Sequence, residues 1–338
     1  MVASIEDVAR RAGVSIATVS RALRGLPDVA AATRDRVFAA ANELNYVASP
    51  FAARLASGRT ATVGVVVPFV NRWFFAEVID TVETALRNAG FDLLLYNLGD
   101  EQGRARFFDV MPMRKRVDAV LVASLMLSDE EFDALSDLDA SVALLGLERP
   151  GFLSARIDDV CSARVAVEHL LALGHRRIGL IGGDTDDPMR FTPPLHRRDG
   201  YRDALRAAGI EPDPTLEVLG YFTVDGGGEA AGRLLSVPER PTALFAESDE
   251  MAYGALRTIR RAGLRVPEDV AVIGFDDQIN AELMDLSTMR QPVAEQALDV
   301  TTRLLAALGT SDVPEPANVV LPTELVVRGS TDASKSVY

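Results

Sequence analysis

Residues 5–21 of the chain read IEDVARRAGVSIATVSR. Ser4 precedes this stretch in a capping-box-like arrangement, and the apolar residues that follow have the i, i+3, i+4, i+7 spacing of one helix face. Gly13 is suited to end that helix, and Ser15 can cap a second helix over residues 16–23. The stretch therefore predicts two short helices joined by a glycine turn.

A third helix is predicted over about residues 33–44, with Thr33 as its cap. The residues expected to form its buried stripe are Val37, Ala40, Ala41 and Leu44. Two short helices with a tight turn, braced by a third, make the helix-turn-helix arrangement, whose second helix enters the major groove of DNA. We therefore expect the head of the chain to bind DNA.

The charge of the chain is divided unevenly along its length. The net charge is -14, yet residues 1–60 hold eight arginines against five acidic residues, which gives them +3 and leaves -17 for the remainder. Contacts to phosphates need basic side chains. A basic head on an acidic body meets the phosphates while the body is repelled, so the charge distribution favours DNA binding by the head.

A short capped segment follows the head and reads SPFAARLASGRT over residues 49–60. Ser49 at the cap, Pro50 at the first helical position and Gly58 at the end bound a helix of about two turns. So short a helix is not stable in isolation. We expect it to form only when another interaction compensates for the entropy lost on ordering it.

The pattern changes near residue 62 to alternating strands and helices. The first series has expected strands at 62–67, 91–96, 119–123 and 142–145 and helices at 75–88 and 104–115. The second series starts near residue 161, with helices at 162–172, 198–208 and 251–262 and strands at 178–181, 243–245 and 270–274. These series predict two doubly wound parallel-sheet units, with a cleft at the carboxyl ends of their strands. A helix at 294–308 and a strand at 324–327 are expected to cross back and complete the first unit.

The predicted parts are a helix-turn-helix domain at 1–47, a hinge helix and linker at 48–60, and a core at 61–330. Within the core, the first subdomain is expected to cover about 61–160 and 290–329, and the second about 161–289. No run of about 18 uncharged apolar residues occurs, and the N-terminus lacks the basic and apolar stretches of an export signal. We therefore expect a soluble, cytoplasmic protein without a membrane partner.

The sequence offers little for catalysis. His169, His175 and His196 lack the spacing of metal ligands. Gly182 and Gly183 follow a predicted strand but lack the full phosphate-binding fingerprint. We expect no enzymatic activity, no cofactor and no metal.

The stretch at 5–21 resembles the signature of the LacI/GalR family of bacterial repressors. The similarity continues in order through ELNY at 43–46, Arg and Leu at 54–55, GHRRIG at 174–179 and VIGFDD at 272–277. The resemblance implies an all-α helix-turn-helix head and an α/β periplasmic-binding-protein-like core of two doubly wound parallel-sheet subdomains. It also implies a homodimer that binds a pseudo-palindromic DNA operator under the control of a small effector in the cleft.

The resemblance assigns DNA contacts to the head and the hinge. Ile16, Ala17 and Arg21 should face base edges, where Arg21 can pair with guanine and the two apolar residues favour thymine methyl groups or plain shape. Leu55 matches the hinge leucine that wedges into the minor groove and bends the duplex. The other expected DNA contacts, several of them to phosphates, are Ser4, Ser15, Thr18, Ser20, Asn45, Tyr46 and Ala52.

The effector is expected to lie in the cleft. Arg197 and Asp276 match the family's effector arginine and aspartate, a pair that can hold hydroxyl groups from two sides. Phe74 and Phe75 follow the first strand of the core and could offer ring faces to a sugar or to a planar base. Phe222 could stack on the ligand, and the lesser candidates are Ser248, Asp249 and Gln291.

A sugar is the favoured effector, and the favoured role is repression of carbohydrate-utilisation genes. Two departures weaken that choice: Gly146 stands where many sugar-binding relatives carry aspartate, and Ser248 replaces an asparagine. The loop at 184–196, with three prolines and His196, is also unusual. The alternatives are a nucleoside or purine, another non-sugar effector, a protein co-regulator, and, less in keeping with the basic head, a sugar-binding protein without DNA function. Whether the effector releases DNA or strengthens binding stays open.

Overall fold

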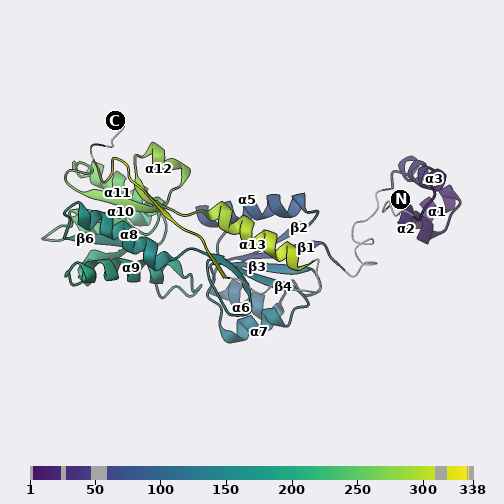
Figure 1. The fold of residues 1–338 in the computed structure, drawn as a ribbon, viewed down its shortest axis with the longest axis horizontal. Coiled ribbons are helices and arrows are strands. Elements are labelled where there is room, and N and C mark those ends of the chain that lie inside the picture. The colour runs from purple at the N-terminus through teal and green to yellow at the C-terminus, as the bar shows by residue number, and fades with distance from the viewer. Residues whose placement is uncertain (1–2, 24–27, 47–58, 309–317, 333, 335–338) are drawn as a thin grey trace.

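The computed structural model describes residues 3–23, 28–46, 59–308, 318–332 and 334 (Figure 1). These residues form an all-helical head and an α/β core of two sheets, which confirms the predicted fold class. Within these ranges no helix is both long enough and apolar enough to cross a membrane.

Three helices build the head: α1 (Ile5–Ala12), α2 (Ile16–Leu23) and α3 (Ala31–Glu43). The Ser4 side chain accepts a hydrogen bond from the backbone N–H of Asp7, and Gly13 ends α1 with a φ of 67°. The α3 helix begins without a side-chain cap, so the prediction that Thr33 caps it was wrong, because Thr33 lies inside its first turn. The head has a core cluster of its own, centred on Val8, Val19, Ala22 and Val37.

The first sheet of the core has six parallel strands in the order β11-β5-β4-β3-β1-β2. The strands are β1 (Thr62–Val67), β2 (Asp92–Asn97), β3 (Ala119–Ala123), β4 (Ser141–Leu145), β5 (Leu153–Arg156) and β11 (Asn318–Val320). Its helices are α5 (Trp73–Asn88), α6 (Glu101–Val110), α7 (Asp129–Ser136) and α13 (Val293–Ala307). We call this sheet with its helices the first subdomain.

The second sheet also has six strands, in the order β12-β10-β9-β8-β6-β7. The strands are β6 (Ile178–Gly182), β7 (Glu217–Leu219), β8 (Ala243–Ala246), β9 (Ala271–Asp276), β10 (Ser287–Arg290) and β12 (Glu324–Val326), and only β12 runs antiparallel to its neighbour. The helices of this second subdomain are α8 (Asp159–Ala172), α9 (Pro193–Ala207), α10 (Val224–Leu235), α11 (Asp249–Arg261) and α12 (Ile279–Leu283), with a 3-10 turn at Pro214–Leu216.

Helices cover both faces of each sheet. In the first subdomain α5 and α13 pack together on one face, and α6 and α7 supply Phe107 and Phe132 to the other (Figure 1). In the second subdomain α8 packs with α9, and α10 packs with α11. Because the central strands are buried on both sides, their sequences are continuous apolar runs, which is why the sequence located them.

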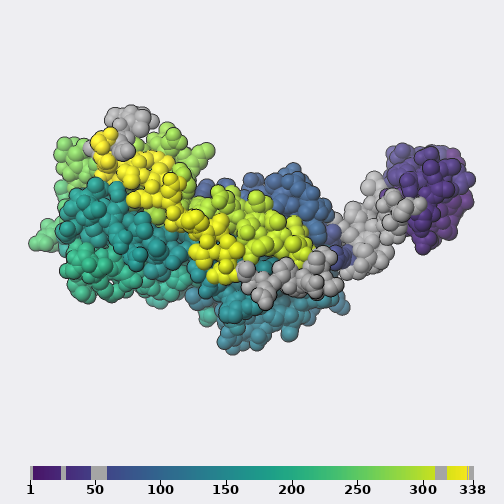
Figure 2. Space-filling view, viewed as in Figure 1, coloured from purple at the N-terminus to yellow at the C-terminus, as the bar shows by residue number. Residues whose placement is uncertain are grey.

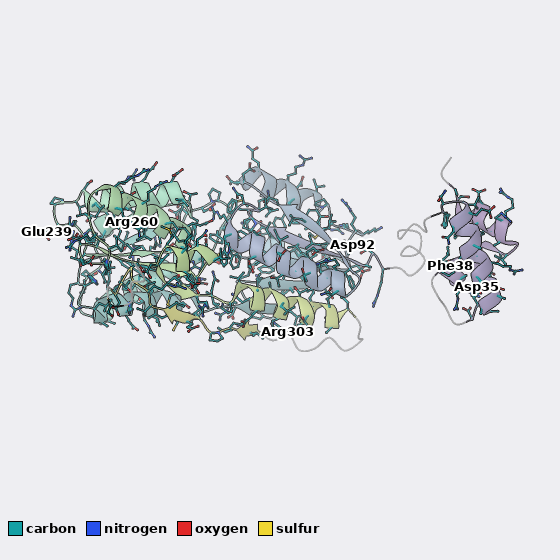
Figure 3. All side chains as sticks on the ribbon, turned by 90° about the horizontal axis from the view of Figure 1, so that it is seen from above. Asp35, Phe38, Asp92, Glu239, Arg260 and Arg303 are labelled. Atoms are coloured by element: carbon teal, nitrogen blue, oxygen red, sulfur yellow. The ribbon has the colours of Figure 1, made fainter. Side chains whose placement is uncertain are left out.

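The chain crosses between the subdomains three times, after β5, after β10 and after β11. In the space-filling view the last described residues lie along the surface of both subdomains (Figure 2). The α13 helix packs on the first subdomain as expected, where Arg303 (Figure 3) pairs with Asp299 and donates to the backbone carbonyl of Ser154 in β5. The crossings place the cleft between the two sheets.

One expectation about the late segment was wrong. The predicted strand at 324–327 does not complete the first unit, because β12 pairs with β10 of the second sheet. The strand that joins the first sheet is β11, which pairs with β5. With three residues, β11 is too short to give a pattern in the sequence. Residues 324–326 therefore belong with the second sheet, whereas the Leu321 N–H still bonds to Arg156 of the first.

Two helix starts and ends differ from the expected ones for local reasons. The α6 helix begins at Glu101 because the Asp100 side chain caps it, and it ends at Met111, whose φ is 45°. The α9 helix starts five residues before the expected position, since Pro193 and Pro194 occupy its first turn, where a missing N–H costs nothing.

The chain is fixed where it enters the first sheet. The Asp118 carboxylate, ahead of β3, accepts hydrogen bonds from the backbone N–H and the hydroxyl of Thr60 and from the N–H of Ala61, at 2.7 to 2.9 Å. The Arg59 side chain donates to the backbone carbonyl of Leu308 at the end of α13, at 2.6 Å. The end of the linker is therefore bound to two elements of the first subdomain.

The α10 helix was missed from the sequence because glycines at 226–228 argue against a helix. Gly227 and Gly228 are explained by the close approach of α10 to α11, and Gly226 by its contact with the backbone of Gly220. A Cβ atom on Gly254 of α11 would lie 1.9 Å from the carbonyl oxygen of Val224, whereas Gly232 of α10 has no atom nearer than 3.9 Å to its Cβ position. Only the first of these two glycines is required by packing.

We therefore expect Gly254→Ala and Gly232→Ala to have opposite effects. The first forces α10 and α11 apart and should lower the unfolding midpoint by several degrees, because backbone atoms cannot yield cheaply. The second should be neutral or raise stability by about 0.5–1 kcal/mol, since alanine favours a helix over glycine. Thermal unfolding followed by circular dichroism measures both, and equal midpoints for the two variants would contradict the close-packing explanation.

Candidate functional site

A cavity lies where the carboxyl ends of the two sheets face each other. Seven of the eight side chains expected to bind an effector line it: Phe74, Phe75, Arg197, Phe222, Ser248, Asp276 and Gln291. Asp249, named as a lesser candidate, does not line the cavity; it lies beneath it, where its carboxylate accepts from the Thr288 hydroxyl and the Gln278 N–H. The expected residues thus meet at one place although they come from distant parts of the chain.

Arg197 is the most firmly held of these side chains. Its Nε pairs with Asp159 at 2.8 Å, and its Nη1 donates to the backbone carbonyl of Glu247 at 2.5 Å. The guanidinium lies 3.6 Å from the centre of the Phe275 ring. Asp276, the expected partner, is farther away at 3.7 Å. The expected pair therefore exists, but the shorter ion pair is with Asp159, which the sequence analysis did not identify.

Asp276 ends β9 in an unusual state. Burial raises the pKa of its carboxyl to about 7, although Arg197 opposes this shift. Its Oδ1 accepts a hydrogen bond from Gln291 at 2.5 Å, and its φ of 119° lies in a region that side-chain-bearing residues rarely adopt. Such backbone strain is concentrated at functional sites. Asp276 is thus held in the cavity with a proton that it can lose near neutral pH.

Aromatic rings from both subdomains form one wall of the cavity. Phe74 meets Phe75 edge-on at 5.2 Å between ring centres, and Phe191 bridges Phe75 at 5.9 Å and Phe222 at 5.3 Å. Phe75 is fully buried and belongs to the core of the first subdomain. Phe74 and Phe222 remain as the expected residues whose rings can meet a ligand.

Arg72 stands among these rings and was not expected. Its guanidinium lies 4.0 Å from the centre of the Phe69 ring and about 5.5 Å from Phe191 and Phe222. Burial lowers the pKa of Arg72, and its Nη1 atom is buried without a hydrogen-bond partner among the described residues. A buried donor without a partner costs free energy, so this atom is available for a ligand oxygen.

The two sequence departures also lie on the cavity wall. Gly146 has a φ of 76°, and a Cβ atom there would lie 2.3 Å from the hydroxyl oxygen of Ser124. Ser248 is buried, and its hydroxyl accepts from the N–H of Met251 as the cap of α11. Neither position therefore supplies the carboxylate or amide that sugar-binding relatives were expected to carry.

In the head, the side chains expected to face bases are exposed on α2. Ile16 is 47% exposed, Ala17 is exposed, and Arg21 forms an exposed ion pair with Asp28 at 3.3 Å. Ser15 caps the helix by accepting from the Thr18 N–H at 3.2 Å. Of the remaining expected contacts, Asn45 is exposed, Ser4, Thr18, Ser20 and Tyr46 are half-buried, and Ala52 and Leu55 lie outside the described residues.

Comparisons with known proteins match this architecture. The model described as "Bacterial regulatory proteins, lacI family" matches residues 4–49, and the one described as "Periplasmic binding protein-like domain" matches residues 167–331. The HTH-type transcriptional repressor CytR of Escherichia coli strain K12 is 35% identical over 98% of this chain and 97% of its own. The chain belongs to the LacI family of bacterial regulators.

Solved structures of LacI-family proteins are similar over the whole chain. The regulator CelR in complex with cellobiose is 34% identical, with a TM-score of 0.71 over 97% of this chain and 99% of its own. The lac repressor dimer bound to its operator and the anti-inducer ONPF is 26% identical, with a TM-score of 0.86 over 98% and 99%. The chain is accordingly a transcriptional regulator and not an enzyme.

Glu247 is a second buried acidic residue of this LacI-family regulator that the sequence analysis did not identify. Its side chain is buried at the end of β8, where it accepts a hydrogen bond from the N–H of Gly183 at 2.8 Å. Burial raises the pKa of its carboxyl to about 8. The only signal in the sequence was its position directly after a buried strand.

The raised pKa of Glu247 makes the stability of the fold depend on pH. Between the ordinary pKa near 4.5 and about 8 the folded state holds a proton that the unfolded state releases, so this contribution falls as pH rises through 8. We expect Glu247→Gln to match the parent at pH 5 and to have the higher unfolding midpoint at pH 8.5. Glu239→Gln, at an exposed position (Figure 3), is the control. A constant difference between Glu247→Gln and the parent across this range would contradict the assignment.

Proposed function

We propose that this LacI-family regulator binds a pseudo-palindromic operator as a homodimer and represses carbohydrate-utilisation genes under the control of a sugar bound in the cavity. One observation supports a sugar as the ligand. Arg197, Asp276 and the unpartnered Nη1 atom of Arg72 lie together beside the Phe74 and Phe222 rings. Charged donors and acceptors beside aromatic faces suit a ring that carries hydroxyl groups. The complex of the relative CelR with cellobiose supports the same class of effector.

A second subunit is part of this proposal because the operator has two half-sites. Ile279 and Leu283, four residues apart on α12, are 88% and 67% exposed. Residues with this spacing lie on one helix face, so they offer a small apolar surface to a partner. The structure of the lac repressor dimer on its operator is consistent with such an assembly.

The α13 helix offers a route between effector and DNA. Gln291 and Gln296, before and within its first turn, line the cavity, and Leu308 at its other end accepts the hydrogen bond from Arg59 of the linker. Fifteen residues of helix span about 22 Å. A ligand that shifts the start of α13 therefore acts on the linker through a stiff element, which gives the two sites the coupling that allostery requires.

Substitution of Ile16 and Ala17 by other residues should change which operator sequence is preferred, because these two exposed side chains are expected to face bases. Replacement of Arg21 by alanine should cost about 1–3 kcal/mol at a guanine of the site. Selection of bound sequences from a randomised duplex pool measures both effects. Phe38→Ser, at an exposed position on α3 (Figure 3), is the control. Unchanged preference after substitution of Ile16 and Ala17 would overturn the assignment of α2 as the recognition helix.

A bound effector should stabilise the full chain and so raise its unfolding midpoint. At a ligand concentration a hundredfold above Kd, the free energy of unfolding should increase by about 2.7 kcal/mol. A thermal-shift screen of sugars and nucleosides identifies it. Asp276→Asn should lose the shift, whereas Asp225→Asn, an exposed carboxylate on α10, should keep it. Because hydroxyl donors favour the ionised carboxylate, the shift of the parent should be larger at pH 8 than at pH 6.

The screen also decides between effector classes. Nucleosides are the second candidate, since the rings of Phe74 and Phe222 can stack on a planar base as well as on a sugar. A shift with nucleosides alone would replace the sugar in the proposal. A shift that Asp276→Asn leaves intact would place the ligand elsewhere.

A further inference from the structure

A second cavity lies within the second subdomain, and we call it the α9 cavity. Residues of β6, β7 and α9, the 3-10 turn and the residue after β8 line it. These residues are Leu180, Gly182, Gly183, Arg198, Pro214, Glu217, Val218, Leu219 and Glu247. None of them lines the cavity of Arg197 and Asp276, the effector cavity of the proposed function. The α9 cavity is therefore a separate place at which a ligand can bind.

Arg198 brings an unpaired positive charge to the α9 cavity. This half-buried side chain donates from Nη1 to the Thr185 hydroxyl at 3.2 Å. Its Nε atom is buried without a hydrogen-bond partner, and the guanidinium forms no ion pair with the residues that the structure describes. A charge withdrawn from water in this way is stabilised by an opposite charge that also accepts hydrogen bonds. The state of Arg198 therefore favours an anionic ligand.

The two acidic side chains of the α9 cavity do not balance the charge of Arg198. The Glu217 carboxylate is already neutralised by Arg202, which donates to its two oxygens at 2.8 and 2.7 Å. Glu247 accepts from the Gly183 N–H, and burial raises the pKa of its carboxyl to about 8, so this group is mostly protonated at neutral pH. A protonated carboxyl can donate a hydrogen bond. The cavity is thus positive overall and has donors on two sides.

The remaining side chains of the α9 cavity are apolar. Leu180 is buried, Val218 is half-buried and Leu219 is 41% exposed, and Pro214 of the 3-10 turn completes this part of the wall. An apolar wall with a few convergent polar groups is typical of sites for small organic molecules. A ligand that fits both parts has an anionic head and a short hydrocarbon body.

We propose that the α9 cavity is a second ligand site, which binds a small carboxylate with a short aliphatic body between Arg198, Glu247 and the apolar wall. The proposal does not depend on the identity of the effector, because the two cavities are lined by different residues. They are nevertheless neighbours. Glu247 lines the α9 cavity with its side chain, while its backbone carbonyl accepts the hydrogen bond from Arg197 of the effector cavity.

The test compares three ligands of one shape by ligand-observed nuclear magnetic resonance and isothermal titration of the full chain at pH 7. The probes are butyrate, its amide butyramide, and butylamine, with isovalerate as a second carboxylate. At least one carboxylate should bind with a Kd of about 1 mM or lower, which is within reach of so small a ligand. The amide and the amine should bind at least about tenfold more weakly, because only the anion balances the charge of Arg198.

Two variants locate the site. Arg198→Ala removes the charged donor and Leu219→Trp fills the cavity, and each should weaken carboxylate binding at least about tenfold. Arg206→Ala, which breaks an exposed ion pair with Asp203 on the same helix, is the matched control and should change the affinity by less than about twofold. Circular dichroism checks that each variant folds. Because Leu219 is partly exposed, its variant tests the site even where Arg198→Ala does not fold.

Each contrary result overturns the inference. If neither carboxylate binds, or if the amide binds as tightly as the carboxylate, the α9 cavity is not an anion site. Preferential binding of butylamine would assign the cavity to a cation instead. Retention of carboxylate binding in both folded variants would place that ligand elsewhere. None of these results bears on the proposed function, which the screen of sugars and nucleosides with Asp276→Asn tests separately.

Discussion

A buried ion pair between Arg197 and Asp159 underlies the geometry of the cavity. Both side chains are at least nine-tenths buried, and the guanidinium also rests on the Phe275 ring and donates to the Glu247 carbonyl. These contacts tie the starts of α8 and α9 to the ends of β8 and β9. Loss of one partner of such a pair typically costs about 3–5 kcal/mol, because the other charge stays buried. The cavity is therefore shaped by the fold before any ligand arrives.

Burial determines the protonation of the neighbouring carboxyl groups. It raises the pKa of Asp276 to about 7, and Arg197, which lies closer to Asp159, opposes that rise only in part. Asp249 lies deeper, and its own pKa is raised by burial and by the charge of Asp276. The end of β9 thus concentrates carboxyl groups that cannot all ionise together. A ligand that donates hydrogen bonds to Asp276, the one of these two that lines the cavity, would favour its ionised form.

The sequence predicted those parts of the molecule that depend on local pattern. The bounds of α2, β1 and β3 match residue for residue, because helical spacing and buried apolar runs are strong signals. The sheet of β12 could not be predicted, since pairing with β10 is a long-range choice between two edges. The glycines at 226–228 hid the α10 helix, because the close contacts that require them, with Gly220 and with α11, exist only in three dimensions.

The candidate site likewise contains residues that the sequence predicted and residues that it could not predict. Seven of its eight expected residues meet because parallel strands end at a shared edge, a general property of doubly wound sheets. Asp159 and Arg72 were missed because nothing in their local sequence marks them. Asp159 belongs to the site through its contact with Arg197, thirty-eight residues away. Arg72 belongs to it because rings from both subdomains surround its guanidinium.

Trp73, the only tryptophan of the chain, begins α5 at the rim of this cavity. Its backbone N–H donates to the carboxylate of Glu250, which belongs to α11 of the other subdomain. The indole is half-buried and packs against the apolar core. Tryptophan emission, which can be excited selectively over that of the six tyrosines, therefore originates beside a contact that joins the two halves of the cleft. The indole is therefore an intrinsic fluorescent reporter of this contact, and no label is needed to follow it.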